Sequence, residues 1–169
     1  MSPELSSYDK RFLKTAMQAL VVKINNNFYG FDMSQVHEIT TKVKITRVPN
    51  ARETVKGVAN LRGKIVPIVD LRKLLDLKDS ASCAGCFVFF RLNMNQIIGV
   101  HVDEISKTIN LSSEQIRPAP IGEQGTDLAG AVVGLYPEAG LDTPVILLDI
   151  NKLFLVEEQI DNSNTVQNL

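Results

Sequence analysis

The sequence predicts a mainly β protein made of two similar units with short helices. Short apolar runs rich in β-branched residues recur along the 169 residues, and turn residues separate them at close intervals. Strands this short with frequent turns favour small barrels over an open sheet. The chain also repeats itself, because the sequence around Gly30 recurs around Gly99 and the sequence around Asp70 recurs around Asp149.

The most distinct element is a hairpin centred on Arg62 and Gly63. Polar and apolar residues alternate before this turn, which is the period of a strand. Gly63 can supply the positive φ of a tight turn. Residues 65–69 are apolar and mostly β-branched, so we expect a well-buried returning strand. Pro67 has no N–H to donate, which predicts an edge or a bulge at that position.

Asp70 follows the hairpin and is expected to cap a helical turn at residues 71–75 by accepting from its free N–H groups. Two catalytic interpretations of the stretch fail. A phosphate loop needs four residues between its glycines and a hydroxyl after its lysine, whereas five residues separate Gly57 from Gly63 and an isoleucine follows Lys64. Asp70 has no histidine or second carboxylate near it in the sequence, which favours the cap.

The remaining strands are predicted as three further hairpins, each with a polar turn. These hairpins join residues 19–24 to 28–32, 86–92 to 96–102 and 128–135 to 144–148. After the first hairpin we expect a helical turn at residues 34–39, capped by Asp32 or Ser34. Ser112 and Gln115 have the spacing of a capping box for a second short turn.

Residues 17–155 are expected to form the folded domain, with a tail at residues 1–16 and a disordered tail at residues 156–169. The repeat divides the domain into a unit of roughly residues 17–82 and a unit of roughly residues 86–155. Each unit is small enough to need the other for burial of its apolar side chains. The sequence leaves open whether the units exchange strands.

Charge and hydropathy exclude several classes of function. The formal net charge is −1, so the chain has no global field that would recruit nucleic acid or an anionic membrane. No apolar run approaches the ~20 residues that span a bilayer, and no direct membrane insertion is expected. The first residues lack the basic and then apolar layout of a secretion signal, so a cytoplasmic location is expected.

No catalytic constellation stands out in the sequence. It contains no nucleophile elbow, no metal-binding histidine pair and no glycine-rich nucleotide loop after a strand. His37 and His101 sit singly in apolar alternation, which is typical of surface histidines or satisfied core histidines. The sequence therefore predicts a binding protein that is not an enzyme and holds no cofactor and no metal.

Cys83 and Cys86 form a Cys-x-x-Cys pair with two interpretations. A structural zinc needs four ligands, and the other candidates, His37 and His101, are far away in the sequence. A thioredoxin-like pair needs its first cysteine at a helix start, whereas Cys83 lies in a loop that enters a strand. Two reduced thiols are favoured, and a small redox or metal protein is the alternative.

Basic residues gather between Thr41 and Lys73. The segment holds nine of them, opposed only by Glu53 and Asp70. The nine are Lys42, Lys44, Arg47, Arg52, Lys56, Arg62, Lys64, Arg72 and Lys73. They indicate either solvated strand faces or a surface that steers an acidic partner.

Two segments together resemble the CheW family, the adaptor proteins of bacterial chemotaxis. Residues 57–72, Gly-Val-Ala-Asn-Leu-Arg-Gly-Lys-Ile-Val-Pro-Ile-Val-Asp-Leu-Arg, are similar to the central motif of that family. Residues 114–120, Glu-Gln-Ile-Arg-Pro-Ala-Pro, are similar to a second segment at a fitting spacing. The resemblance covers roughly residues 18–155 and implies two five-stranded, SH3-like barrels packed side by side.

The resemblance implies a non-catalytic adaptor that bridges the cytoplasmic tip of a chemoreceptor to the histidine kinase CheA. It also implies that the chain alternates with the regulatory domain of the kinase, which has the same fold, in the rings of a receptor array. Family members also serve pilus motility and other chemosensory pathways, and such a pathway is the alternative.

The resemblance further implies two sets of contact residues. The receptor-binding set is Leu20, Met33, Val36, Glu38, Ile39 and Arg62. The kinase-binding set is Ile45, Val48, Gly57 and Val58. A receptor tip is a helical hairpin, which should place apolar anchors in an apolar groove. The alternative for the apolar members of the receptor-binding set is plain core packing, and for Arg62 it is a surface ion pair with Asp70.

Overall fold

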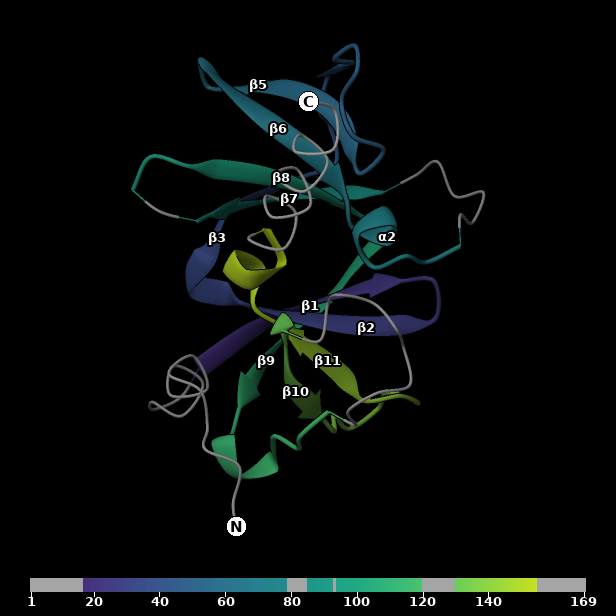
Figure 1. The fold of residues 1–169 in the computed structure, drawn as a ribbon. Coiled ribbons are helices and arrows are strands. Elements are labelled where there is room, and N and C mark those ends of the chain that lie inside the picture. The colour runs from purple at the N-terminus through teal and green to yellow at the C-terminus, as the bar shows by residue number, and fades with distance from the viewer. Residues whose placement is uncertain (1–16, 79–84, 93, 120–129, 155–169) are drawn as a thin grey trace, which may run out of the picture.

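The computed structural model describes residues 17–78, 85–92, 94–119 and 130–154 (Figure 1). The expected tails at residues 1–16 and 156–169, and Cys83, lie outside this part of the chain. The described residues form two sheets with short helices, and Figure 1 shows the six-stranded sheet above the five-stranded one. The predicted mainly β fold is confirmed.

The two sheets differ in their number of strands. The five-stranded sheet has the order β10-β11-β2-β1-β9 and contains β1 (Met17–Ile24), β2 (Asn27–Asp32), β9 (Glu104–Leu111), β10 (Val132–Tyr136) and β11 (Val145–Leu148). The six-stranded sheet has the order β3-β7-β8-β6-β5-β4 and contains β3 (Val36–Thr40), β4 (Ile45–Thr46), β5 (Val55–Leu61), β6 (Lys64–Asp70), β7 (Cys86–Arg91) and β8 (Ile97–Val102). The short helices are η1 (Met33–Gln35), α2 (Leu71–Leu74) and η2 (Ser113–Gln115).

Strands are exchanged between the two halves of the chain. β3 follows β2 in the sequence but pairs with β7 in the six-stranded sheet, and β9 follows β8 but pairs with β1 in the five-stranded sheet. Each sheet therefore combines strands from both expected units. The expected boundary between residues 82 and 86 falls inside the six-stranded sheet, which runs in sequence from β3 to β8.

The internal repeat of the sequence corresponds to a repeat of the fold. Gly30 on β2 lies opposite Leu147 on the parallel strand β11, and Gly99 on β8 lies opposite Ile68 on the parallel strand β6. A Cβ atom at Gly30 would lie 2.8 Å from Cδ2 of Leu147, and one at Gly99 would clash with Cδ1 of Ile68. Glycine makes room for the large neighbour in both places, so the predicted equivalence is confirmed.

The two repeated aspartates also play equivalent parts. The Asp70 carboxylate accepts from the backbone N–H of Arg72 at 3.0 Å, at the start of α2. The Asp149 carboxylate accepts from the backbone N–H of Asn151 at 2.9 Å, where residues 150–154 are helical. Both caps satisfy N–H groups that a helix leaves free at its start. The cap predicted at Asp70 is confirmed, and Asp149, which the sequence repeat relates to Asp70, caps a helical turn in the same way.

Apolar side chains of the described residues form three cores. Leu20, Val22 and Ile24 of β1 point into a central core that is shared by the two sheets. Ala19 and Val21 point the other way, into the core of the five-stranded sheet. Burial on both faces explains the continuous apolar run of β1. The third core lies against β5, β6 and β7.

The β5–β6 hairpin has the predicted two-residue turn. Arg62 has φ of 50° and Gly63 has φ of 88°, which are left-handed values as in a type I′ turn. The returning strand is not buried throughout as predicted, because Ile65 and Pro67 face outward while Val66 faces the core. β6 pairs with β8 only after Pro67, which fits the predicted edge at this residue.

Two predicted helical turns differ in detail. The turn expected at residues 34–39 is only η1, capped by Asp32, whose carboxylate accepts from the N–H two residues on at 2.8 Å. The following residues form β3 instead, because they pair with β7. Ser112 makes no side-chain cap bond to η2. Gln115 does not complete a capping box with it, because its Oε1 accepts from the Tyr136 hydroxyl at 2.7 Å.

Candidate protein-interaction surfaces

Burial divides the receptor-binding set that the resemblance implied. Leu20 is 2% exposed and lies in the central core, so its side chain is not available to a partner. Met33 and Val36 are half-buried and pack against the same core. Ile39 is 40% exposed on β3. The accessible part of the receptor-binding set is therefore centred on β3. Leu20 is a core residue, as the alternative interpretation predicted.

Glu38 and Arg62 meet although they are far apart in the sequence. Nη2 of Arg62 lies 3.4 Å from Oε2 of Glu38, and the two side chains are 81% and 29% exposed. Such an exposed pair adds only ~0–1 kcal/mol to stability, so it orients Arg62 more than it holds the fold. Asp70, the alternative partner of Arg62, instead lies 3.4 Å from Nζ of Lys56.

The predicted kinase-binding set lies together on β4, β5 and the loop after β4. Val48 is 43% exposed, whereas Ile45 is half-buried against the core of the six-stranded sheet. Val58 is half-buried and pairs with Thr46 of β4. Ile45 and Val48 also line a hollow of about 600 Å³ whose polar lining includes Lys56.

Gly57 contributes shape to this set, since it has no side chain. It is buried and has φ of 147°, which other residues rarely adopt. A Cβ atom there would clash with the carbonyl oxygen of Thr46 and lie 2.8 Å from Cγ2 of Ile45. Gly57 therefore lets β4 approach β5 closely, and in this way it positions Ile45.

A second hollow joins the two sets, and we call it the β3–β5 hollow. Its volume is about 330 Å³, and its lining includes Glu38, Lys42, Lys44, Val58, Asn60 and Ile65. It thus brings Glu38 of the receptor-binding set together with Val58 of the kinase-binding set. Sequence reasoning missed Ile65 because an apolar run predicted burial. The available signal was its two-residue spacing to Pro67, which already indicated an edge.

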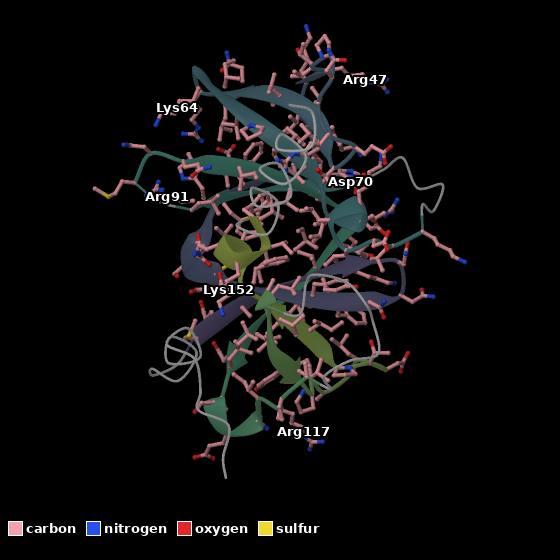
Figure 2. All side chains as sticks on the ribbon, in the orientation of Figure 1. Arg47, Lys64, Asp70, Arg91, Arg117 and Lys152 are labelled. Atoms are coloured by element: carbon pink, nitrogen blue, oxygen red, sulfur yellow. The ribbon has the colours of Figure 1, made fainter. Side chains whose placement is uncertain are left out.

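The basic residues between positions 41 and 73 do not form one patch. Arg72 is only 5% exposed and pairs with Asp103. Lys56 is also ion-paired. Figure 2 shows Lys64 and Arg47 at opposite ends of the six-stranded sheet. Any attraction of an acidic partner must therefore come from local groups of these residues.

His101 is held by neighbouring groups. It is 6% exposed, its Nδ1 lies 3.1 Å from Nζ of Lys56, and its ring centre lies 4.9 Å from that of Phe87. Burial lowers the pKa of His101 below its ordinary value of 6.5, and the charge of Lys56 lowers it further. Because an ammonium group only donates, Nδ1 accepts and the imidazole is neutral.

The other candidates for chemistry are placed as follows. Cys86 is half-buried and packs against the central core. Nδ1 of His37 lies 3.0 Å from Nη2 of Arg91. In the ranges that the structure describes, no three His, Cys, Asp or Glu side chains are grouped so that they could hold a metal ion. Within the same ranges, no helix has the length and apolar character needed to cross a membrane.

Two exchanged β units with mixed apolar and charged surfaces define a protein-binding module. The family model described as the CheW-like domain matches residues 18–158. The chemotaxis protein CheW of Klebsiella aerogenes is 38% identical over 146 residues, which cover 85% of this chain and 86% of that protein. The chain therefore belongs to the CheW family, whose members are non-catalytic scaffold proteins of chemotaxis signalling.

Two further similarities agree with this assignment in different degrees. The crystal structure of the scaffolding protein TtCheW from Thermoanaerobacter tengcongensis superposes with a TM-score of 0.72 at 28% identity, covering 83% of this chain and 93% of that one. The protein PilI of Pseudomonas aeruginosa is 29% identical over 100 residues, which cover 57% of this chain and 56% of PilI. The predicted CheW-like fold and the predicted role as a scaffold protein of chemotaxis signalling are confirmed.

Proposed function

We propose that this chain couples the cytoplasmic tip of a chemoreceptor to the histidine kinase CheA, in the cytoplasm at the inner face of the membrane. The observation that carries the proposal is the arrangement of the accessible contact residues. Ile39 lies on β3 and Val48 follows β4, and these strands are the two edges of the six-stranded sheet. The β3–β5 hollow is lined by residues of both strands, so these two edges lie near each other, and two partners can bind side by side with the hollow between them.

We define the receptor area as Val36, Glu38, Ile39 and Arg62. Ile39 offers an exposed apolar anchor, and Val36 extends it toward the core. Arg62 offers a cation that Glu38 orients. Glu38 and Ile39 point to opposite faces of β3, which is an edge strand, so a receptor helix that lies across this edge can place an apolar side chain on Ile39 and an acidic one on Arg62.

We define the kinase area as Ile45, Val48 and Val58. These three side chains are apolar and β-branched, and they lie on or beside the adjacent strands β4 and β5. Gly57 sets the distance between these strands. Ile45 and Val58 face opposite sides of the β4–β5 ladder, so the exposed apolar residue of the area is Val48, and Ile45 supports it from the core. Polar residues such as Arg47 and Lys56 lie beside Val48, which gives the mixed composition of a protein–protein contact.

Matched variants test the division into two areas. Ile39→Ser and Val48→Ser each remove a branched apolar side chain of similar exposure, 40% and 43% respectively. Ile39→Ser should weaken binding to a purified receptor tip fragment by about tenfold and change binding to the CheA regulatory domain by less than about twofold. Val48→Ser should do the reverse. Identical effects of both variants, or a wild-type chain that binds neither partner, would contradict the proposal.

A second candidate is the same coupling role in a pilus-motility pathway. The similarity to the protein PilI supports this candidate, but it extends over only 100 residues, which are 57% of this chain. Capture on the immobilised wild-type chain from its native cytosol, followed by identification of the bound histidine kinase and receptor, decides between the two. Recovery of a pilus-motility kinase in place of a chemotaxis kinase would favour the second candidate.

A further inference from the structure

Ile65 is an apolar side chain in an unusual position. It is 69% exposed on β6 and lies opposite Asn60 of β5. In the described part of the chain, only Met94 among the large hydrophobic side chains is more exposed, at 94%. A single exposed isoleucine is ordinary on a protein surface. Ile65, however, also lines the β3–β5 hollow, whereas Met94 does not.

Part of the lining of the hollow is apolar, and the space that it encloses can hold a side chain. Val43 and Val58 are half-buried in its lining, and Ile65 stands beside them. Its volume is about 330 Å³, and it is open to water. That space suits one or two side chains of a partner. Release of this water from apolar walls would favour insertion.

Positive charge at the hollow is not compensated within the described residues. Lys42 and Lys44 line it and are exposed, and neither forms an ion pair with another described residue. Glu38, the acidic residue of the lining, is paired with Arg62. The hollow therefore favours a partner that carries negative charge next to an apolar group.

We propose that the β3–β5 hollow receives one apolar side chain of an acidic, amphipathic helix, which packs against Ile65 while an acidic residue of the same helix reaches Lys42 and Lys44. The inference rests on the proposed function, and the occupant is a helix of the chemoreceptor tip. Charge supports this occupant, because the exposed cations Lys42 and Lys44 lie in the lining together with Glu38, which orients Arg62 of the receptor area. Val58 of the kinase area also lines the hollow, so binding of the kinase domain is measured in parallel. Residues three or four apart on a helix lie about 5–6 Å apart, so one turn can supply both contacts.

The experiment uses the full-length chain and a purified receptor cytoplasmic fragment that contains the tip. Ile65→Ser should weaken binding of this fragment by about tenfold. Met94→Ser removes an even more exposed apolar side chain that lies outside the hollow and should change binding by less than about twofold. Binding of the CheA regulatory domain, measured in parallel, should be unchanged in both variants.

Charge variants provide the second test. Lys42→Glu with Lys44→Glu should weaken receptor binding by about tenfold at low salt, and the deficit should narrow as salt is raised, because exposed charges are screened within about 8 Å at physiological salt. Lys64→Glu reverses an exposed lysine of β6 that is not part of the lining and serves as the control. Thermal unfolding of each variant should match the wild-type chain, since all these side chains are exposed.

The outcomes separate the inference from the proposed function. A wild-type chain that does not bind the receptor fragment overturns both. A wild-type chain that binds, with Ile65→Ser binding equally well, overturns only the role of the hollow. Loss of kinase-domain binding in Ile65→Ser with receptor binding retained also overturns it, because the occupant would then be the kinase.

Discussion

Arg72 and Asp103 form an ion pair at the junction of the two sheets. Arg72 lies on α2, after β6 of the six-stranded sheet, and is 5% exposed. Asp103 lies between β8 and β9, where the chain crosses to the five-stranded sheet. Its second carboxylate oxygen accepts from the backbone N–H of Asn25, in the β1–β2 turn, at 2.8 Å. One carboxylate therefore connects three chain segments from both sheets.

Removal of the Asp103 carboxylate should destabilise the fold strongly. Asp103→Ala leaves the guanidinium of Arg72 buried without this partner and the N–H of Asn25 without its acceptor, which should cost about 3–5 kcal/mol in the free energy of unfolding. Urea unfolding of the wild-type chain and the variant measures this change in the free energy of unfolding. Asp142→Ala, at an exposed position between β10 and β11, is the control and should change the value by less than about 0.5 kcal/mol. A loss below about 1 kcal/mol in Asp103→Ala would show that the pair does not hold the junction.

Two glycine variants separate backbone strain from steric clash. Gly57 and Gly63 both have positive φ, but a Cβ atom would clash only at Gly57, because nothing lies within 4 Å at Gly63. Gly63→Ala should therefore cost about 1 kcal/mol, and Gly57→Ala at least about 2 kcal/mol. Chemical denaturation of the two variants measures both losses in the free energy of unfolding. Equal costs would mean that β4 moves freely away from β5.

The stability of the fold should depend on His101 at mildly acidic pH. Burial and Lys56 lower the pKa of His101 in the folded chain below 6.5, so the unfolded chain binds the proton first as pH falls. The free energy of unfolding should therefore decrease as pH falls through 6.5, and this contribution should level off below the folded pKa. Asp70, Arg72 and Asp103 also act on the ring and partly oppose one another.

Denaturation at a series of pH values, in the wild-type chain and in His101→Gln, isolates this contribution. The variant should lose the part of the pH dependence that begins near the ordinary pKa of 6.5. His37→Gln, at an exposed position on β3, should retain it. A wild-type chain and a His101→Gln variant with parallel curves would mean that the histidine titrates alike in the folded and unfolded states.

Arg62→Glu should impair stimulation of the kinase while leaving the stability of the fold nearly unchanged. Arg62 is 81% exposed and faces Glu38, so charge reversal should change the free energy of unfolding by about 0.5 kcal/mol. Receptor-dependent stimulation of the kinase should fall much more, because a reversed contact charge repels what the original attracted. Glu38→Arg added to this variant restores an ion pair but not the original charge pattern, so it should not restore stimulation. A large loss of stability in Arg62→Glu would make Arg62 structural, and unchanged stimulation would remove it from the interface.

The local elements were predictable because their signals are local. The turn at Arg62 and Gly63 and the caps at Asp70 and Asp149 depend on neighbouring residues, and the sequence repeat around Gly30 indicated the repeated fold. The exchange of β3 and β9 could not be predicted. It depends on which hairpin each strand meets across the central core, and both sheets offer similar partners.

The surface residues were predictable only in part. Leu20 and Ile65 both lie in apolar runs, yet Leu20 is buried because the second sheet covers its face of β1, and Ile65 is exposed because none of the described residues covers its face of β6. A sequence shows the alternation of a strand but not which face is covered. The approach of Glu38 to Arg62 likewise depends on the exchanged position of β3.

If this chain couples receptor to kinase, as we propose, the rate of CheA autophosphorylation should depend on it. The rate is measured with receptor-containing membranes and kinase, with and without the chain, and with chain and kinase alone. We predict stimulation only when receptor, kinase and chain are all present. The same rate with and without the chain on receptor membranes would show that this chain does not couple the two proteins.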